Sequence, residues 1–200
     1  MAYKARELSP ETLPDFERLA LKQGECWCMF YHRAKPVGRN KSPEERRRIN
    51  RKDQRALVRT DRSHAILVYE GETPIGWCQF GTKEELPRID ARRTYRKAAP
   101  PAAAQTLWRI TCFFVDRDHR GRGVATFALK AALEGIRRRG GGVVEAYPVV
   151  SEDMAAVPEW RWFGTRGMFR KQGFRTVAAL GTSGVLMRRT IPAGRRRTRS

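Results

Sequence analysis

A ten-residue stretch at positions 116–125, DRDHRGRGVA, carries groups that can hold an anion. Gly121 and Gly123 let the backbone approach a ligand closely. Arg120 and Arg122 add positive charge. The stretch follows an apolar run and opens a helical pattern, and the first amides of a helix have no internal partner. We therefore predict a phosphate-binding turn, with a solvated RG-rich patch for nucleic acid as the alternative interpretation.

Two residues of the run GVVEAYPVV are suited to proton transfer. Glu145 and Tyr147 are two apart on a predicted strand, so they share a face. A carboxylate on an inner strand is costly unless it is paired or functional. We expect Glu145 to act as a general base, directly or through water, or else to pair with one of the many arginines. Tyr147 donates a proton or orients a substrate, or else it packs as an ordinary aromatic residue.

The cysteines offer two further kinds of chemistry. Cys112 is a candidate nucleophile, but no histidine is close in sequence to lower its pKa, which favours a buried structural thiol. Cys26, Cys28 and His32 have the spacing C-x-C-x3-H. A structural zinc site usually has four ligands and often C-x2-C spacing. The aromatic residues between them favour a packed segment, so we expect no metal.

Hydrophobic periodicity and capping residues predict the elements that position these groups. Ser9 is expected to cap the first helix, with Pro10 in its first turn. The residues of 81–106, which end in a Pro/Ala-rich run, are expected to form a mobile loop. The expected strands are 3–8, 64–70, 74–80, 107–115, 142–150, 175–180 and 184–190, and the expected helices are 9–21, 42–60, 124–139 and 164–173.

This order of elements indicates a mixed α/β fold with the strand–turn–helix–strand unit of residues 108–150 at its centre. The length and the 40% hydrophobic content are enough for one domain with a real core. We expect a single domain over residues 1–190. The basic tail, residues 191–200, is expected to be disordered.

The turn carries a resemblance to a known family. Residues 120–125 fit R-x-x-G-x-A, which resembles the acetyl-CoA pyrophosphate motif of the GNAT N-acetyltransferase superfamily. The following strand, and MFRKQGF as an aromatic-x-x-x-Gly-Phe element, extend the resemblance over about residues 3–190. It implies a central mixed, mostly antiparallel sheet with helices on both faces. It also implies a splayed cleft between two central strands, which we place between residues 108–115 and 143–150.

The same resemblance assigns cofactor roles, with acetyl-CoA as the co-substrate. The backbone of Phe114 and Val115 would pair with the pantetheine arm, and Phe169 would lie beside the thioester. The pyrophosphate would be held by the amides of Gly121, Arg122, Gly123, Val124 and Ala125 together with the backbone of Arg120. Many relatives have a proton-donating tyrosine at the position of Phe169, and some have a catalytic glutamate near the position of Arg109. Neither of these usual catalytic groups is therefore present at its family position in this sequence.

Aromatic residues on two segments are candidates for an acceptor site. The family places the segment GECWCMFYH over the acceptor, so Trp27, Tyr31 and His32 are expected to line it. Trp160 and Trp162 in PEWRWFGT are expected on the other side of the cleft. Aromatic walls fit an apolar or planar acceptor, and ordinary packing under a loop is the alternative.

These features predict an N-acetyltransferase that moves an acetyl group from acetyl-CoA to a primary amine by direct attack in a ternary complex. The amine belongs to a small molecule or a protein, and a longer acyl donor is compatible with the arginines. The alternative is a nucleic-acid-associated or degenerate acyl-CoA-binding protein without acetyltransferase activity on small amines. Acceptor identity stays open.

The charge balance bears on partners. The formal net charge is +20, from 41 Lys+Arg against 21 Asp+Glu, which attracts phosphates and repels cationic partners. No recognition motif for nucleic acid is present, so any such binding is expected to be nonspecific. No run approaches the roughly 20 apolar residues of a membrane span, and no signal-like run precedes the first strand. A cytoplasmic protein is expected, and a homodimer is compatible with the sequence.

Overall fold

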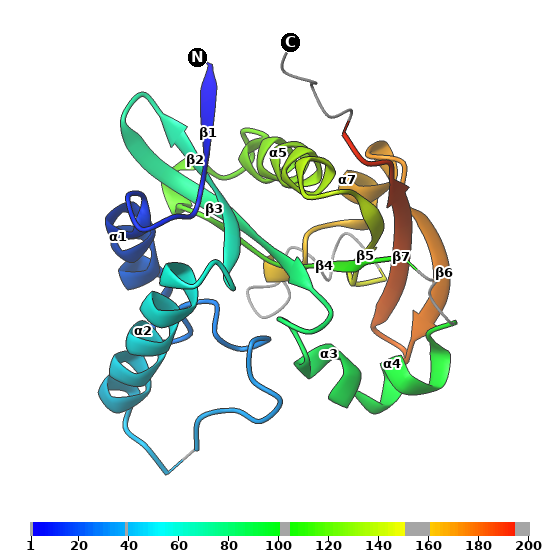
Figure 1. Cartoon of the computed structure of the whole chain (residues 1–200), viewed down its shortest axis with the longest axis horizontal. Helices are drawn as coiled ribbons and strands as arrows, with labels where there is room; N and C mark the ends of the chain where they lie inside the picture. The colour runs from blue at the N-terminus through cyan, green and yellow to red at the C-terminus, as the bar shows by residue number, and fades with distance from the viewer. Residues whose placement is uncertain (1, 39, 101–104, 151–160, 195–200) are drawn as a thin grey trace.

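The computed structural model describes residues 2–38, 40–100, 105–150 and 161–194. Its described residues form one seven-stranded sheet in the order β1-β2-β3-β4-β5-β7-β6 (Figure 1). Every neighbouring pair is antiparallel except β4 and β5, which are parallel. The strands are β1 (Tyr3–Glu7), β2 (His64–Glu70), β3 (Thr73–Thr82), β4 (Leu107–Val115), β5 (Gly142–Ala146), β6 (Arg175–Leu180) and β7 (Gly184–Ile191). The expected mixed, mostly antiparallel sheet is confirmed.

The sheet opens between its two central strands, as the family resemblance implies. β4 pairs with β5 only from Leu107 to Ile110. The second half of β4 keeps its pairing with β3 on the other side. Backbone groups of β4 that point away from β3 therefore have no strand to pair with beyond Ile110. β5 is shorter than the predicted 142–150, because Pro148 has no amide hydrogen to continue a ladder.

Helices cover both faces of the sheet (Figure 1). One face packs against α5 and α7, around a core that contains Phe80, Leu129 and Phe169. The other face packs against α1 and α2, around a core that contains Phe16 and Trp77. The helices are α1 (Leu13–Gln23), α2 (Pro43–Arg59), α3 (Arg88–Ala91), α4 (Arg93–Ala98), α5 (Val124–Arg138) and α7 (Arg166–Lys171), with 3-10 turns at Arg117–His119 and Arg161–Phe163.

The first helix begins later than predicted. α1 starts at Leu13, after Thr12, and not at Ser9 and Pro10. Thr12 Oγ1 accepts a hydrogen bond from the Ser9 amide at 2.9 Å and donates to the Glu7 carbonyl at 2.8 Å. These bonds form a tight turn that contains the residues between β1 and α1, so the helix begins only after it. α2 begins with a reciprocal capping box formed by Ser42 and Glu45.

The predicted mobile loop at 81–106 instead contains α3 and α4. Arg109 on β4 explains this difference, since its side chain is fully buried and requires a counter-ion. Asp90 in α3 supplies the counter-ion at 2.7 Å, and the Leu86 carbonyl accepts a second bond at 2.8 Å. Ile89 and Tyr95 are also buried. The two short helices are therefore fastened to the sheet.

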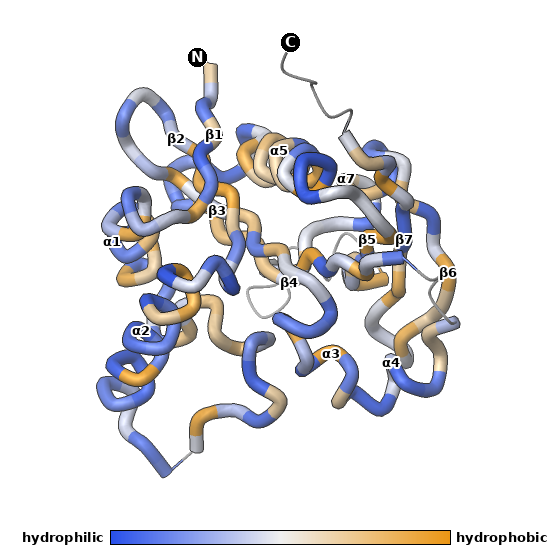
Figure 2. Tube along the Cα trace, viewed as in Figure 1, coloured by the Kyte–Doolittle hydropathy of each residue, from blue (hydrophilic) through white to orange (hydrophobic). Residues whose placement is uncertain are grey.

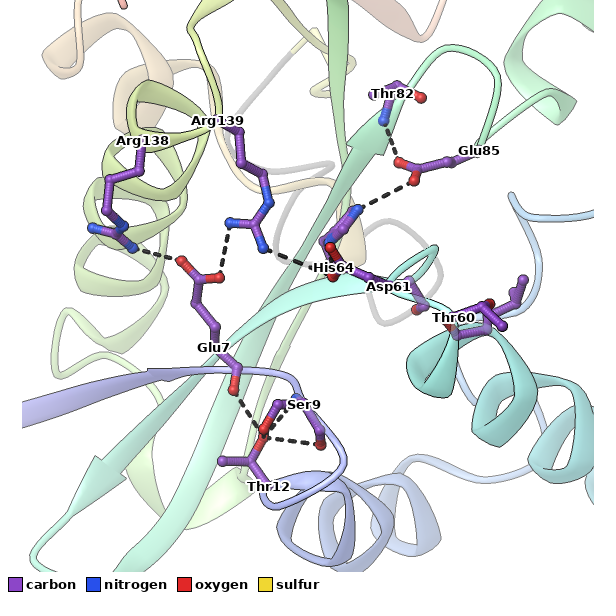
Figure 3. Close-up of polar contacts among 12 residues, drawn as sticks. Glu7, Ser9, Thr12, Thr60, Asp61, His64, Thr82, Glu85, Arg138 and Arg139 are labelled. Atoms are coloured by element: carbon purple, nitrogen blue, oxygen red, sulfur yellow. Dashed lines mark hydrogen bonds and ion pairs between the residues drawn. The ribbon is translucent and has the colours of Figure 1, made fainter. Parts of the chain in front are cut away.

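The far end of α5 is fixed by ion pairs (Figure 3). Arg138 and Arg139 contact the two oxygens of Glu7 on β1, at 2.5 Å and 2.8 Å. Burial alone raises the pKa of Glu7, but the hydrogen bonds from the two arginines outweigh it and lower that pKa. Cations at the C-terminus of a helix also interact favourably with its dipole. These contacts fix the direction in which the N-terminus of α5 points.

Candidate functional site

The turn between β4 and α5 presents unpaired amides. Gly121 and Gly123 adopt φ of +75° and +81°, a region that other residues rarely enter. The first internal bond of α5 runs from the Phe127 amide to the Gly123 carbonyl, at 3.0 Å. None of the amides from Gly121 to Thr126 has an acceptor within the described part of the chain. Their number and position make the turn suitable for an anion with several oxygens.

Hydrogen bonds from two neighbouring side chains stabilise this turn. Tyr3 on β1 donates its hydroxyl to the Arg122 carbonyl at 3.1 Å. Arg120 folds back and donates from Nε to the Val115 carbonyl, also at 3.1 Å. The guanidinium of Arg120 therefore helps to shape the turn at the end of β4. This geometry favours backbone amides as the main anion ligands.

A cavity of about 400 Å³ extends from the turn along β4. We call it the β4–α5 cavity. It contains both the unpaired backbone of β4 and the free amides of the turn. Its lining residues are Phe113, Phe114, Val115, His119, Arg120, Gly121, Gly123, Val124, Ala125, Thr126, Trp162, Gly164, Thr165 and Met168.

A second cavity, of about 380 Å³, lies farther along β4. We call it the aromatic cavity. Its lining residues are Gln23, Glu25, Cys26, Cys28, Phe30, Tyr31, Gln79, Thr111, Cys112, Trp162 and Phe163. Trp162 lines both cavities, so they meet beside it. β4 bulges at this junction, because Cys112 pairs with Gln79 while Ile110 pairs with Phe80, which leaves Thr111 as the extra residue.

The aromatic cavity contains polar groups that the sequence reasoning missed. Thr111 donates to Gln79 Oε1 at 2.9 Å, and Gln79 Nε2 donates to the Cys28 carbonyl at 2.8 Å. Glu25 is the one carboxylate among the described lining residues, and Arg46 on α2 contacts it at 2.8 Å. In the sequence, Glu25 could have been identified as the one charged residue of the segment GECWCMF.

Three thiols line this cavity, at Cys26, Cys28 and Cys112. Burial raises the pKa of Cys26 to about 11 and that of Cys28 well above its ordinary value. Both thiols are therefore protonated at neutral pH, and no histidine is among the described lining residues. The lack of a histidine among these described residues favours the structural-thiol interpretation of Cys112. Within the described residues no group of three His, Cys, Asp or Glu side chains is placed to hold a metal ion.

Glu145 and Tyr147 lie together, but in a buried network. The Glu145 carboxylate is fully buried and accepts from Tyr95 at 2.8 Å and from Tyr147 at 2.7 Å. Arg188 donates to its other oxygen from two nitrogens, at 2.7 and 2.9 Å. Neither residue is among the described lining of the two cavities. The contacts favour the salt-bridge alternative, and the base role stays a prediction.

The other residues predicted to line the acceptor and cofactor sites do not all lie in the two cavities. Trp162 and Tyr31 line the aromatic cavity, whereas Trp27 packs between Phe16 and α2, on the other side of its own segment. Phe169 is fully buried in the core behind the β4–α5 cavity, at 6.0 Å from the Phe113 ring centroid. The expected position of Trp160 lies outside the described residues, as does most of the predicted disordered tail.

His32 is held as a structural residue. Its ring nitrogens contact the Glu85 carbonyl at 2.9 Å and Ser63 Oγ at 3.3 Å. Burial lowers its pKa to about 4, more than the neighbouring Glu85 groups raise it. His32 is not among the described lining of the aromatic cavity.

This shift predicts a pH dependence of stability. The unfolded chain takes up a proton at His32 near pH 6.5, whereas the folded protein does so only near pH 4. The His32 contribution is therefore present above about pH 6.5 and is lost as pH falls towards 4, by up to about 3 kcal/mol. Urea unfolding at pH 7 and pH 4.5 should show a smaller loss in His32→Gln than in the native protein. Equal losses in both proteins would contradict this assignment.

Comparison with known proteins agrees with this geometry. Residues 25–174 match the model of the Acetyltransferase (GNAT) family. An acetyltransferase from Thermus thermophilus is 17% identical over 95% of this chain and 97% of its own, with a TM-score of 0.52. An N-acetyltransferase from Staphylococcus aureus is 14% identical over 96% and 99%, with a TM-score of 0.51. The ribosomal-protein-S18-alanine N-acetyltransferase from Escherichia coli is 10% identical over the whole of both chains, with a TM-score of 0.51. No curated protein matches the sequence.

The opened mixed sheet agrees with the fold of these acetyltransferases. The family match covers most of the chain, so the protein belongs to the Acetyltransferase (GNAT) family. The three structures share its fold at low identity. In the described part of the chain, every helix is too short or too polar to cross a membrane.

Proposed function

We propose that this protein transfers an acetyl group from acetyl-CoA to a primary amine, by direct attack of the amine in a ternary complex. One observation carries the proposal. The β4–α5 cavity and the aromatic cavity meet at Trp162, beside the bulge of β4. A donor in the first cavity and an acceptor in the second would therefore touch at one point.

The residues of the β4–α5 cavity fit acetyl-CoA. The free amides of residues 121–126 suit the pyrophosphate, which several N–H groups can bind at once. The edge of β4 that faces away from β3, near Phe114 and Val115, suits the amide groups of pantetheine, which would add to the sheet like another strand. When bound, acetyl-CoA supplies an activated acyl group. Family membership supports this choice of donor.

The chain's own groups would then act at the junction. A bulge turns backbone groups of β4 out of the ladder, so an amide near Thr111 would be suited to stabilise negative charge on the acyl oxygen. Glu25, which also pairs with Arg46, would accept a hydrogen bond from the incoming ammonium group. The phenol of Tyr31 stays protonated, because burial raises its pKa far above neutrality. It is therefore suited to donate a hydrogen bond to the acceptor.

The aromatic cavity indicates the class of acceptor. Phe30, Tyr31, Trp162 and Phe163 form walls for an apolar body, and Glu25, which pairs with Arg46, provides one carboxylate. This arrangement favours one amine on a compact apolar group. The net charge of +20 disfavours polycations such as aminoglycosides.

The test combines donor binding with turnover. Acetyl-CoA, longer acyl-CoAs and free CoA are compared in a thermal-shift assay, and CoA release is then followed with an arylalkyl amine, an aliphatic polyamine and an aminoglycoside. We expect acetyl-CoA to stabilise the protein and the arylalkyl amine to give the highest kcat/KM. A polyamine as best acceptor would contradict the assignment of the aromatic cavity. Failure of every CoA compound to stabilise the protein would refute the proposed function.

A further inference from the structure

A third cavity, of about 530 Å³, runs along the outer side of α2. We call it the basic groove. Leu21 and Trp27 form its apolar floor, and Glu44 is its one acidic lining residue among those described. Its basic lining residues are Arg47, Arg48, Arg51, Lys52, Arg55 and Arg59. The proposed transferase reaction has no use for this groove.

The basic residues form regular rows. Arg47, Arg51, Arg55 and Arg59 follow one another at intervals of four, so they share one face of α2. At 1.5 Å per residue, the row extends over about 18 Å, which is about five nucleotide steps of 3.4 Å along a duplex. α2 is mostly hydrophilic along its length (Figure 2). Such a row is complementary to a linear polyanion.

Much of this charge is not neutralised within the protein. Glu17 contacts Arg51 at 2.8 Å and also pairs with Arg55. Burial alone would raise the pKa of Glu17, but the bonds from these two arginines lower it to about 2. No ion pair is formed by Arg47, Arg48, Lys52 or Arg59 among the described residues. The groove therefore keeps a strong net positive charge.

Trp27, one of the lining residues of this groove, also has an unpartnered donor. Trp27 is almost fully buried, and its Nε1 has no acceptor among the described residues. The Arg51 guanidinium stands over its ring, 5.6 Å from the centroid. A buried indole N–H without an acceptor is unusual. An oxygen-rich ligand in the groove could supply that acceptor after a small local shift.

We propose that the basic groove docks the phosphodiester backbone of a nucleic acid. Five of its six basic side chains are arginines, whose planar guanidinium groups match phosphate in a bidentate manner. Leu21 is the one large exposed hydrophobic side chain in the groove, which is too little apolar surface for insertion into a membrane. The regular spacing and the absence of base-reading features indicate sequence-independent binding.

The groove shares a wall with the aromatic cavity. Trp27 lines the groove, and the adjacent Cys28 lines the cavity. Both adopt a left-handed backbone conformation, with φ of 53° and 55°, which is costly for residues other than glycine. An amine carried by a nucleic-acid-bound partner would thus be held near the acceptor cavity. This last consequence rests on the proposed function, whereas the docking itself does not.

The test measures binding of fluorescently labelled 20-nucleotide RNA and DNA, single- and double-stranded, between 50 and 200 mM salt. The variant Arg47→Gln/Arg48→Gln/Lys52→Gln removes three charges from the groove. The control Arg96→Gln/Lys97→Gln/Lys130→Gln removes three exposed charges from α4 and α5. We expect micromolar binding by the native protein and a loss of about 10-fold or more in the groove variant. The plot of log K against log[salt] should be less steep in that variant, with the magnitude of its negative slope reduced by about 2 to 3.

The control variant should change binding by less than about twofold. Equal losses in the two variants would overturn the proposal, since they would show attraction by overall charge alone. Absence of binding to every nucleic acid at 150 mM salt would also overturn it, as would binding of anionic vesicles in place of nucleic acid. A difference in affinity between RNA and DNA would identify which nucleic acid the groove binds. Acetyl-CoA should still stabilise both variants in the thermal-shift assay. If it does while nucleic-acid binding fails, the docking proposal is wrong and the proposed function is unaffected.

Discussion

Gly123→Val is expected to weaken acetyl-CoA binding by about 30-fold, measured by isothermal titration calorimetry. Gly123 caps α5 at φ +81°, where a β-branched side chain is strained. Relief of that strain would turn the neighbouring amides away from the anion. Loss of one hydrogen bond to a charged group costs about 2 kcal/mol, which corresponds to this loss of affinity. Arg122→Ala should cost less than about threefold, because an exposed charge contributes little.

Gly140→Val is a matched control for this experiment. Gly140 follows the other end of α5 at φ +98°, and an added Cβ would meet no atom within 4 Å there, as at Gly123. Both variants should lose about 1–2 kcal/mol of stability from backbone strain. Only Gly123→Val should lose affinity for acetyl-CoA. Equal affinity losses in the two variants would show a general destabilisation in place of a local binding effect.

Glu145→Leu is expected to reduce the free energy of unfolding by about 3–5 kcal/mol in urea denaturation at pH 7. The carboxylate is fully buried and balances Arg188, and it also accepts bonds from Tyr95 and Tyr147. Its removal leaves Arg188 without that carboxylate partner and the two hydroxyls without their acceptor. Breaking one side of a buried ion pair typically costs this amount.

Glu134→Leu is the control for Glu145→Leu. Glu134 pairs with Arg137 on the surface of α5, at 3.3 Å, with about half of its side chain exposed. Such pairs contribute about 1 kcal/mol or less. The double variant Glu145→Leu/Arg188→Leu should recover part of the stability, since it buries no unpaired charge. A loss in Glu145→Leu no larger than in Glu134→Leu would contradict the account of this network.

The proton-transfer role of Glu145 can be separated from its structural role. Glu145→Gln keeps the shape of the side chain but removes its charge. Turnover with the native pH profile in a folded Glu145→Gln variant would remove the base assignment. Loss of the ascending, acidic limb of that profile would support it, despite the contacts of Arg188 with the carboxylate.

The central unit of the fold was predictable from local sequence. LWRITCFFV is a strong strand pattern, and the two glycines before VATFALKAALEGIRRR mark a turn that leads into a helix. These signals depend on neighbouring residues alone. The structure therefore agrees with the expected β4, turn and α5. The capping box of α2 is local in the same sense, through Ser42 and Glu45.

Long-range pairing could not be predicted in this way. α3 and α4 are held by Arg109, which is distant in sequence, so the segment looked like a loop. Apart from Tyr147, the hydrogen-bond partners of Glu145 come from α4 and β7, and no spacing rule connects Arg188 with it. Trp27 lines the basic groove and Cys28 lines the aromatic cavity, and both have unusual backbone angles. The sequence reveals neither feature.

A crystal structure of the complex with acetyl-CoA tests the central claim most directly. The account predicts the pyrophosphate within hydrogen-bond distance of the amides of residues 121–126. It also predicts pantetheine along Phe114 and Val115, with the thioester beside Trp162 at the entrance to the aromatic cavity. Acetyl-CoA bound in the basic groove, or with its thioester away from the junction of the two cavities, would contradict the account.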